Sequence, residues 1–261
     1  MAQKIPPDDT RPSRADADDV ADAVVGVDTR IFTTIWDTVI HTPRVLQAAF
    51  DGDRDRYVPI LRLFLILFGL QFALVAFMGI PSTLTLEQFD TEAARPVLEA
   101  WLNGQDAAAI NLTLERTANL TNTIFYFIAS LPYILLLKLY RPSRSYFGHL
   151  LAYLLATNAS YLILLPLMAP GILGAFVIWY MIAMVTSLTV FFIAMGRVLH
   201  SHYTQKAWLL TLQLAGMIVL LPITLIIMIA AQFGTAELVV RLVHDRSFME
   251  FFLAAAEANS P

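Results

Sequence analysis

Cysteine is absent from the 261-residue sequence, and charged residues are scarce. The lack of cysteine excludes disulfide bonds, thiolate zinc sites, iron–sulfur clusters, covalently attached haem and cysteine nucleophiles. Charged residues make up 15% of the chain and hydrophobic residues 57%, whereas an average soluble domain is about 25% charged. This composition indicates a membrane environment. The net charge of −4 gives no positive excess that would favour nucleic acid as a partner.

The motifs of several common enzyme classes are also missing. The chain contains no GxSxG, HExxH, GxGxxG or Walker-type sequence. Its long apolar segments contain no aspartate or glutamate, which ion-coupled transporters and intramembrane hydrolases usually need for proton transfer or metal binding. We therefore predict a protein that is not an enzyme and that holds no metal or cofactor.

Five apolar segments are long enough to cross a bilayer as helices. The clearest covers residues 58–80, where about 23 residues would rise roughly 35 Å, more than the roughly 30 Å of hydrocarbon. The sequence therefore predicts an all-α, polytopic bundle of transmembrane helices. The predicted spans cover residues 58–80, 120–140, 147–168, 172–195 and 208–231.

Basic residues are distributed unevenly among the connections. The loop over residues 81–118 is acidic, whereas the segments before the first span, between the second and third, and between the fourth and fifth are basic. An excess of lysine and arginine marks cytoplasmic loops, so we predict a cytoplasmic N-terminus and an external C-terminus. The basic residues are Arg44, Arg54, Arg56, Lys138, Arg141, Arg144, Arg197 and Lys206.

Amphipathic segments flank the predicted spans on both sides. Residues 1–27 are acidic and contain prolines, which predicts a disordered tail. Residues 28–57 predict cytoplasmic amphipathic helices, the first with an aromatic apolar face. This helix could lie on the membrane surface or pack against the bundle, and the two can hold together. On the other side we expect short surface helices within residues 81–118 and an external amphipathic segment over residues 232–261.

Polar residues inside the spans form a candidate polar pocket. The third predicted span carries small residues at Gly148, Ala152, Ala156 and Ser160, which let another helix approach closely. Beside this stripe run polar side chains that either bond neighbouring helices or line a pocket or solute path. Together with two mid-membrane amides from other spans, the candidates are His149, Tyr153, Thr157, Asn158, Gln71 and Gln213.

Basic and aromatic residues near the predicted cytoplasmic boundary are candidates for lipid contact. Arg62 lies one turn inside the first span, where an arginine usually extends its guanidinium group to the headgroups. The candidates for interface or lipid contact are Arg54, Arg56, Tyr57, Arg62, Arg141 and Arg144.

Three histidines near the same boundary give a further alternative. His149, His200 and His202 could supply imidazoles to zinc or to a b-type haem. No carboxylate motif accompanies them, and residues two positions apart on a helix point in different directions. Solvated interfacial histidines are therefore the simpler interpretation.

Two segments resemble a bacterial family of uncharacterised multi-pass membrane domains. The segment TPRVLQAAFDGDRDRYVPILRLFL contains a proline-started helix, a Gly-x-Arg-x-x-Tyr turn and a proline at the start of a span, at Pro43, Gly52, Arg54, Tyr57 and Pro59. The segment YRPSRSYFGHLLAYLL is similar to the family's basic loop and the aromatic–histidine start of a later span. Many members carry an N-terminal four-cysteine zinc ribbon, which this chain lacks. The resemblance implies a protein of the bacterial inner membrane, and the five-span layout is also similar to that of Yip-like membrane proteins.

Three functions are open from the sequence. The first is a non-enzymatic membrane protein that organises lipid or a partner complex, with the bilayer, another membrane protein or a second copy as partners. The second is a small-solute transporter or channel that uses the polar face of the third span. The third is a membrane enzyme with histidine-bound metal or haem. We favour the first, because amphipathic segments flank the spans and the spans contain no acids.

Overall fold

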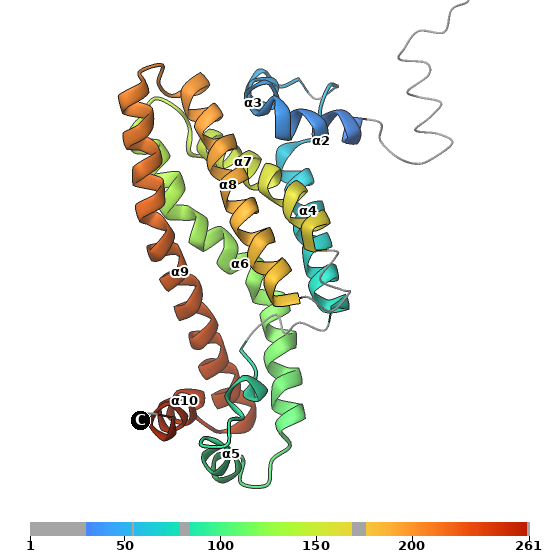
Figure 1. Cartoon of the computed structure of the whole chain (residues 1–261), viewed down its shortest axis with the longest axis vertical. Helices are drawn as coiled ribbons and strands as arrows, with labels where there is room; N and C mark the ends of the chain where they lie inside the picture. Colours follow the sequence, from blue (N-terminus) through green and yellow to red (C-terminus); the bar gives the residue numbers. More distant parts are fainter. Residues whose placement is uncertain (1–29, 54, 79–83, 169–175, 260–261) are drawn as a thin grey trace, which may run out of the picture.

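Every element in the described part of the chain is a helix (Figure 1). The computed structural model describes residues 30–53, 55–78, 84–168 and 176–259. The all-helical prediction is confirmed for these residues, and the tail over residues 1–27 lies outside them. The elements are α2 Arg30–Ile40, α3 Thr42–Asp51, α4 Ile60–Phe77, the 3-10 helix η1 Leu86–Phe89, α5 Arg95–Leu102, α6 Ala107–Tyr140, α7 Tyr146–Met168, α8 Phe176–His202, α9 Ala207–His244 and α10 Phe248–Ala258.

Four of the described helices are long and apolar enough to cross a membrane. They are α4, α7, α9 and the part of α8 from Trp179 to His202. By length and composition the chain is therefore a multi-pass membrane protein, as predicted. The second predicted span, residues 120–140, lies within α6, whose described apolar segment Ile124–Tyr140 is shorter. That fifth crossing stays a prediction.

The helix α6 begins well before the predicted span. Its first residue is Ala107, and the carboxylate of Asp106 accepts a hydrogen bond from the Ala108 amide at 2.9 Å. A carboxylate at this position satisfies one of the amides that a helix start leaves unpaired. Much of the loop expected over residues 81–118 is therefore helical.

The helix α9 does not end near residue 231, where the fifth predicted span ends, so that boundary of the span stays a prediction. It continues to His244 and ends where Asp245 adopts a left-handed conformation, with φ 53°. Ser247 then caps α10, because its hydroxyl accepts a hydrogen bond from the Glu250 amide at 3.1 Å. The amphipathic segment expected after residue 231 is thus divided between the end of α9 and α10.

The most buried helix is α7, which packs against α4, α6 and α8. Within its small-residue stripe, Ala152 and Ala156 are fully buried. The neighbouring helices fill the space beside the stripe with rings: Phe64 of α4 is fully buried, and its ring centre lies 5.1 Å from that of Tyr126. The stripe therefore marks the centre of the bundle.

The helices α6 and α9 extend past the other spans and carry a second hydrophobic core. With 34 and 38 residues, they are roughly 51 and 57 Å long, well over the roughly 30 Å of hydrocarbon. Their far ends pack with η1, α5 and α10, at the end of the molecule opposite α2 and α3 (Figure 1). We call this unit the distal subdomain. Its core contains Leu86, Ala94, Leu98, Ile110, Leu114, Ala236, Val240, Phe248, Phe251 and Ala255.

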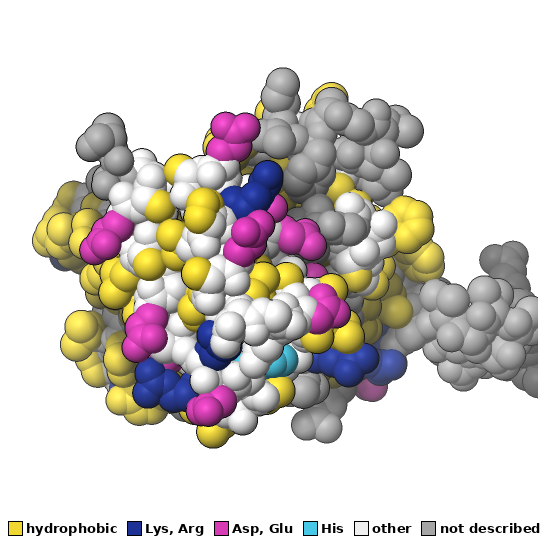
Figure 2. All heavy atoms as spheres, turned by 90° about the horizontal axis from the view of Figure 1, so that it is seen from below, with side chains coloured by type: hydrophobic (Ala, Val, Ile, Leu, Met, Phe, Trp, Pro, Cys, Tyr) yellow, Lys and Arg dark blue, Asp and Glu magenta, His cyan; other side chains and the backbone are white. Residues whose placement is uncertain are grey.

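Polar contacts join the parts of the distal subdomain. The Trp101 indole donates a hydrogen bond to the Ser247 carbonyl at 2.9 Å, and the Arg246 guanidinium group donates to the Trp101 carbonyl. Figure 2 looks onto this end, where acidic and basic side chains are spread over the face and hydrophobic ones are more frequent at its edges. This distribution is typical of a surface that faces water beyond an apolar bundle.

Candidate functional site

The helix α2 packs on the bundle with its polar face and leaves the aromatic residues of its apolar face exposed. Thr34 and Thr38 are fully buried, and Asp37 is 8% exposed. Phe32 and Trp36, by contrast, are 68% and 65% exposed. The helix is therefore packed against the bundle, and its contact with the membrane surface stays a prediction.

Four side chains connect α2 to the segment before α4, and we call them the Asp37 network: Thr34, Asp37, His41 and Tyr57. The Tyr57 hydroxyl donates to Asp37 Oδ2 at 2.6 Å, and His41 Nδ1 lies 3.0 Å from Asp37 Oδ1. The Thr34 hydroxyl accepts a hydrogen bond from the Val58 amide at 2.9 Å. Sequence reasoning missed this network, because a helical pattern places Thr34 and Asp37 on the face expected to meet water.

The contacts of the Asp37 network shift the pKa values of Asp37 and Tyr57. Burial raises the pKa of Asp37, but the hydrogen bonds from Tyr57 and His41 and the positive charges of His41 and Arg56 lower it overall. Burial and the neighbouring carboxylate raise the pKa of Tyr57 to about 12. Near neutral pH an ionised carboxylate therefore accepts from a protonated phenol, and such charge-assisted hydrogen bonds are the strong ones.

Gly52 and Tyr57 of the Gly-x-Arg-x-x-Tyr segment, and Pro59 just after it, have structural roles, and Arg54 lies outside the described residues. Gly52 ends α3 in the left-handed region, with φ 75° and its amide bonded to the Ala48 carbonyl. Tyr57 reaches back to α2, and Pro59 occupies the position before α4, where its carbonyl accepts from the Leu63 amide at 3.0 Å. The segment is therefore a turn that presents one tyrosine to α2.

We expect Gly52→Ala to destabilise the protein by about 1 kcal/mol, because alanine is strained at positive φ. Gly69→Ala in α4 is the matched control. A β-carbon at either position would meet nothing within 4 Å, so the two changes differ in backbone conformation and not in space. Thermal unfolding of the purified protein in detergent measures both, and equal midpoints would contradict the role of Gly52.

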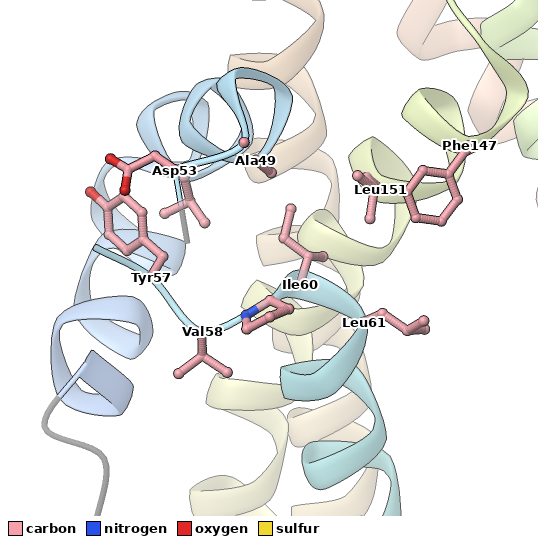
Figure 3. Close-up of a pocket in the computed structure, with 11 residues that line it drawn as sticks. Ala49, Asp53, Tyr57, Val58, Ile60, Leu61, Phe147 and Leu151 are labelled. Carbon is pink, nitrogen blue, oxygen red and sulfur yellow. The ribbon is translucent and has the colours of Figure 1, made fainter. Parts of the chain in front are cut away.

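An apolar cavity of about 350 Å³ lies between α3, the connection to α4 and the start of α7. We call it the interfacial pocket. Figure 3 shows Asp53 and Tyr57 on one side, Phe147 and Leu151 on the other, and Ile60 between them. Phe147 is 59% exposed, so the pocket borders the outer surface of the bundle. An apolar pocket at this border can take part of a lipid chain.

Arg144 lies among aromatic rings at the same end of the molecule. Its guanidinium carbon is 3.9 Å from the ring centre of Phe50 and 5.8 Å from that of Tyr203. Burial lowers the pKa of Arg144. The Tyr203 hydroxyl in turn lies 2.6 Å from Nδ1 of His149, which is fully buried. We call Arg144, Phe50, Tyr203 and His149 the Arg144 cluster. It joins the α6–α7 connection to the α8–α9 connection.

The predicted lipid contacts divide into two groups. Arg56 and Arg62 are exposed, as a lipid contact requires. Arg141 donates to the His202 carbonyl, so Arg141 and Arg144 join loops of the protein. Tyr57 is 4% exposed and its hydroxyl bonds Asp37, and it also lines the interfacial pocket, so its contact with lipid stays a prediction.

The structure brings together three of the six predicted pocket residues. Gln71, Tyr153 and Thr157 line a cavity of about 290 Å³ between α4, α6, α7, α8 and α9. We call it the tyrosine cavity, after its four tyrosines Tyr126, Tyr133, Tyr153 and Tyr161. The other lining residues with hydroxyl groups are Ser160, Ser187 and Thr224.

The remaining three predicted pocket residues bond elsewhere. His149 belongs to the Arg144 cluster. Asn158 Nδ2 donates to the Ile60 carbonyl at 3.0 Å, which joins α7 to the first turn of α4. Gln213 is buried, and its backbone carbonyl accepts from the Tyr140 hydroxyl at 3.1 Å. The side chains of His149 and Asn158 therefore join segments of the protein, which is the structural alternative that the sequence left open, whereas Gln213 does so only through its backbone.

Hydroxyl groups bond one another around the tyrosine cavity. The Tyr126 hydroxyl donates to Thr157 Oγ1 at 3.2 Å, and the Thr157 hydroxyl donates to the Tyr153 carbonyl at 3.1 Å. The hydroxyls of Ser160 and Ser187 lie 2.5 Å apart. The cavity therefore has a polar wall inside an apolar bundle.

The three histidines considered as metal ligands do not form a metal site. Within the described ranges, no group of three or more histidine, aspartate or glutamate side chains could hold a metal ion. His200 is exposed, and His202 Nε2 lies 3.2 Å from the Pro43 carbonyl oxygen. The histidine-metal alternative has no support in this geometry.

Comparison of the chain with protein-family models, curated proteins and solved structures found no match. The resemblance to a bacterial membrane-domain family therefore stays a prediction that rests on the two sequence segments that carry it.

Proposed function

We propose that this chain is a non-enzymatic, membrane-organising protein that binds phospholipid at the cytoplasmic surface of the bacterial inner membrane. One observation supports this function above the others: α2 is attached by its polar face, and Phe32 and Trp36 of its apolar face are exposed. A helix that only covered a bundle would bury its apolar residues. The reverse arrangement is the one expected of a helix that rests its apolar residues in a membrane interface.

Further features of the same end support a phospholipid as the ligand. Aromatic residues such as Trp36 favour the level of the headgroups. The Arg197 guanidinium group donates to the Val39 carbonyl at 2.7 Å, which holds the end of α2 against α8. Arg56 and Arg62 are exposed and can meet lipid phosphates, while the interfacial pocket can take an acyl chain.

The test is to count the phospholipids that stay with the protein in mild detergent by native mass spectrometry. We expect the double change Phe32→Ser and Trp36→Ser to remove bound phospholipid that the unaltered protein retains. The matched control is Leu238→Ser with Leu242→Ser, since these leucines of α9 are also exposed. An unaltered protein that carries no phospholipid, or equal retention in both variants, would refute the proposal.

The proposed orientation puts α2 and α3 in the cytoplasm and the distal subdomain outside. The support is that Lys138 at the end of α6, and Arg141 and Arg144 in the connection to α7, lie at the α2 end, whereas Glu87 and Glu99 belong to the distal subdomain. Single cysteines can test this without background, because the chain has none. In intact cells stripped of outer membrane, we expect Glu99→Cys to react with a membrane-impermeant maleimide and His200→Cys to react only after lysis. The opposite pattern would overturn the orientation.

The tyrosine cavity supports a second candidate function, a transporter or channel for a small solute. Its polar wall within the bundle is the observation that favours this function. A water-filled path would make cysteines placed at Tyr153 and Thr157 reactive toward water-soluble reagents. Cysteines that stay inert from both sides of the membrane would remove this candidate.

A further inference from the structure

The tyrosine cavity combines aromatic walls, hydroxyl groups and one unpaired hydrogen-bond acceptor within an apolar bundle. We propose that it binds an uncharged, membrane-soluble ring compound that carries a hydroxyl group, of the phenol or hydroquinone class. This binding site is independent of the phospholipid function proposed for α2, which lies at the end of the bundle.

The polar wall of the cavity is buried rather than wet. Thr157 and Ser187 are each 6% exposed, and Ser160 is 8% exposed. Polar groups are costly in hydrocarbon unless they find hydrogen-bond partners. These hydroxyls bond one another or the backbone, as described above, so the wall is preformed before any ligand arrives.

The Gln71 side chain differs from these hydroxyl groups, because one of its polar atoms has no hydrogen-bond partner within the described part of the chain. Its side chain lines the cavity, and its Oε1 atom is buried with no hydrogen-bond donor among the described residues. A buried acceptor without a partner carries a cost that a ligand can remove by donating a hydrogen bond. The ligand that fits therefore has a donor, such as a hydroxyl group.

The rings around the cavity favour a flat ligand. Tyr133 and Tyr153 have ring centres 5.3 Å apart with planes at 28°, and Phe191 meets Tyr153 edge-on at 5.8 Å. Aromatic side chains pair with other rings in stacked and edge-on arrangements of this kind. A volume of about 290 Å³ accommodates one or two fused rings.

Two lining residues of the cavity, Met184 and Leu188, lie on the exposed side of α8. They are 44% and 41% exposed, and exposed apolar residues of a spanning helix meet hydrocarbon. Among the described residues that line the cavity, none is acidic or basic. An aromatic cage can hold a cation, but none of these described lining residues supplies a carboxylate to offset its transfer from water into hydrocarbon. An uncharged compound dissolved in the membrane fits both the lining and its exposed side.

Binding of 2-naphthol to the full chain in phospholipid nanodiscs tests this site, with empty nanodiscs to subtract partition into lipid. The companion probe is 2-methoxynaphthalene, which has the same rings and no donor. We expect saturable binding of about one 2-naphthol per chain, roughly tenfold tighter than that of the methoxy compound, because one hydrogen bond to Gln71 separates them.

Variants locate the binding. Gln71→Leu should weaken 2-naphthol roughly tenfold and leave 2-methoxynaphthalene unchanged. Ser187→Trp should abolish binding of both probes by filling the cavity. Thr189→Val is the matched control, since Thr189 lies on the exposed side of the same helix, and it should change neither affinity. Gel filtration checks that each variant stays monodisperse, and Gln71→Leu decides the outcome if Ser187→Trp does not fold.

Three results would overturn the proposal. One is uptake of 2-naphthol equal to that of empty nanodiscs. Another is equal affinity for the two probes, or a 2-naphthol affinity that Gln71→Leu leaves unchanged. The third is tighter binding of phenyltrimethylammonium, seen when it displaces 2-naphthol at a concentration lower than that of the bound 2-naphthol's own half-saturation. This result would identify the cavity as a cage for an organic cation.

Discussion

Replacing Phe251 by alanine is expected to unfold the distal subdomain while the membrane bundle stays folded. Phe251 is 1% exposed, and its ring centre lies 5.0 Å from that of Trp101 and 5.9 Å from that of Phe89. Loss of a buried phenylalanine typically costs about 3–5 kcal/mol. The second core is small and is connected to the bundle through α6 and α9, so a loss of this size removes much of its stability.

Hydrogen exchange of the purified protein measures this effect element by element. In Phe251→Ala we expect faster exchange of the amides of α5 and α10, with the amides of α7 unchanged. Leu253→Ala is the matched control, because Leu253 lies on the same helix and is 56% exposed. Equal acceleration in α7 would show instead that the two cores unfold as one unit.

Replacing Asp37 by alanine is expected to detach α2 from the bundle. The change leaves the buried Tyr57 hydroxyl and the His41 ring without their acceptor, at a cost of about 2–3 kcal/mol. Hydrogen exchange in α2 should accelerate, and that in α7 should not. Asp51→Ala on α3 is the control, because Asp51 is an exposed carboxylate that accepts a hydrogen bond from the neighbouring Gln47. Slow exchange of α2 in Asp37→Ala would contradict the role of the Asp37 network.

The same contact should depend on pH. The pKa of Asp37 is lower in the folded protein than its ordinary value of 3.8, so the carboxylate stabilises the attached state above that value. This contribution is lost as pH falls through the lower folded value. We therefore expect α2 to detach in acid below about pH 4 in the unaltered protein, and Asp37→Ala to show no such transition.

The sequence was sufficient to predict the spanning helices and insufficient to predict how α2 faces the protein. Long apolar runs leave few alternatives, so α4, α7 and α8 lie where the pattern indicated. For α2 the pattern separates an apolar face from a polar one but does not state what each face meets. Thr34 and Asp37 turn inward because Val58 and Tyr57, 24 and 20 residues away, bond them.

The tyrosine cavity was predictable in part. Tyr153 and Thr157 were evident because they share one face of the third predicted span. Tyr126 and Tyr133 were missed, although their spacing of seven residues places them on one face of α6. A tyrosine within an apolar run is compatible with contact with either lipid or a cavity, and only the packing of α6 against α7 decides between them.

The length of α9 was not predictable for a physical reason of the same kind. Charged residues such as Arg241 favoured a separate surface helix, but Arg241 pairs with Glu237 within one turn of α9 at 2.6 Å. On an adjacent face of that turn, Ala236 and Val240 are buried in the distal subdomain. The partner that prolongs the helix comes from α5 and α10, which a local pattern does not contain.

Because α6 and α9 run without interruption from one core to the other, two continuous helices hold the distal subdomain at a fixed position on the bundle. The distance of the subdomain from the bilayer and its rotation about the helix axes are therefore set by the number of residues of α6 and α9 between the two cores. One residue inserted into either helix between the cores would rotate the part of that helix in the distal subdomain by about 100° and shift it along the axis by about 1.5 Å. The two helices must consequently keep matched lengths, and this region tolerates substitution far better than insertion or deletion.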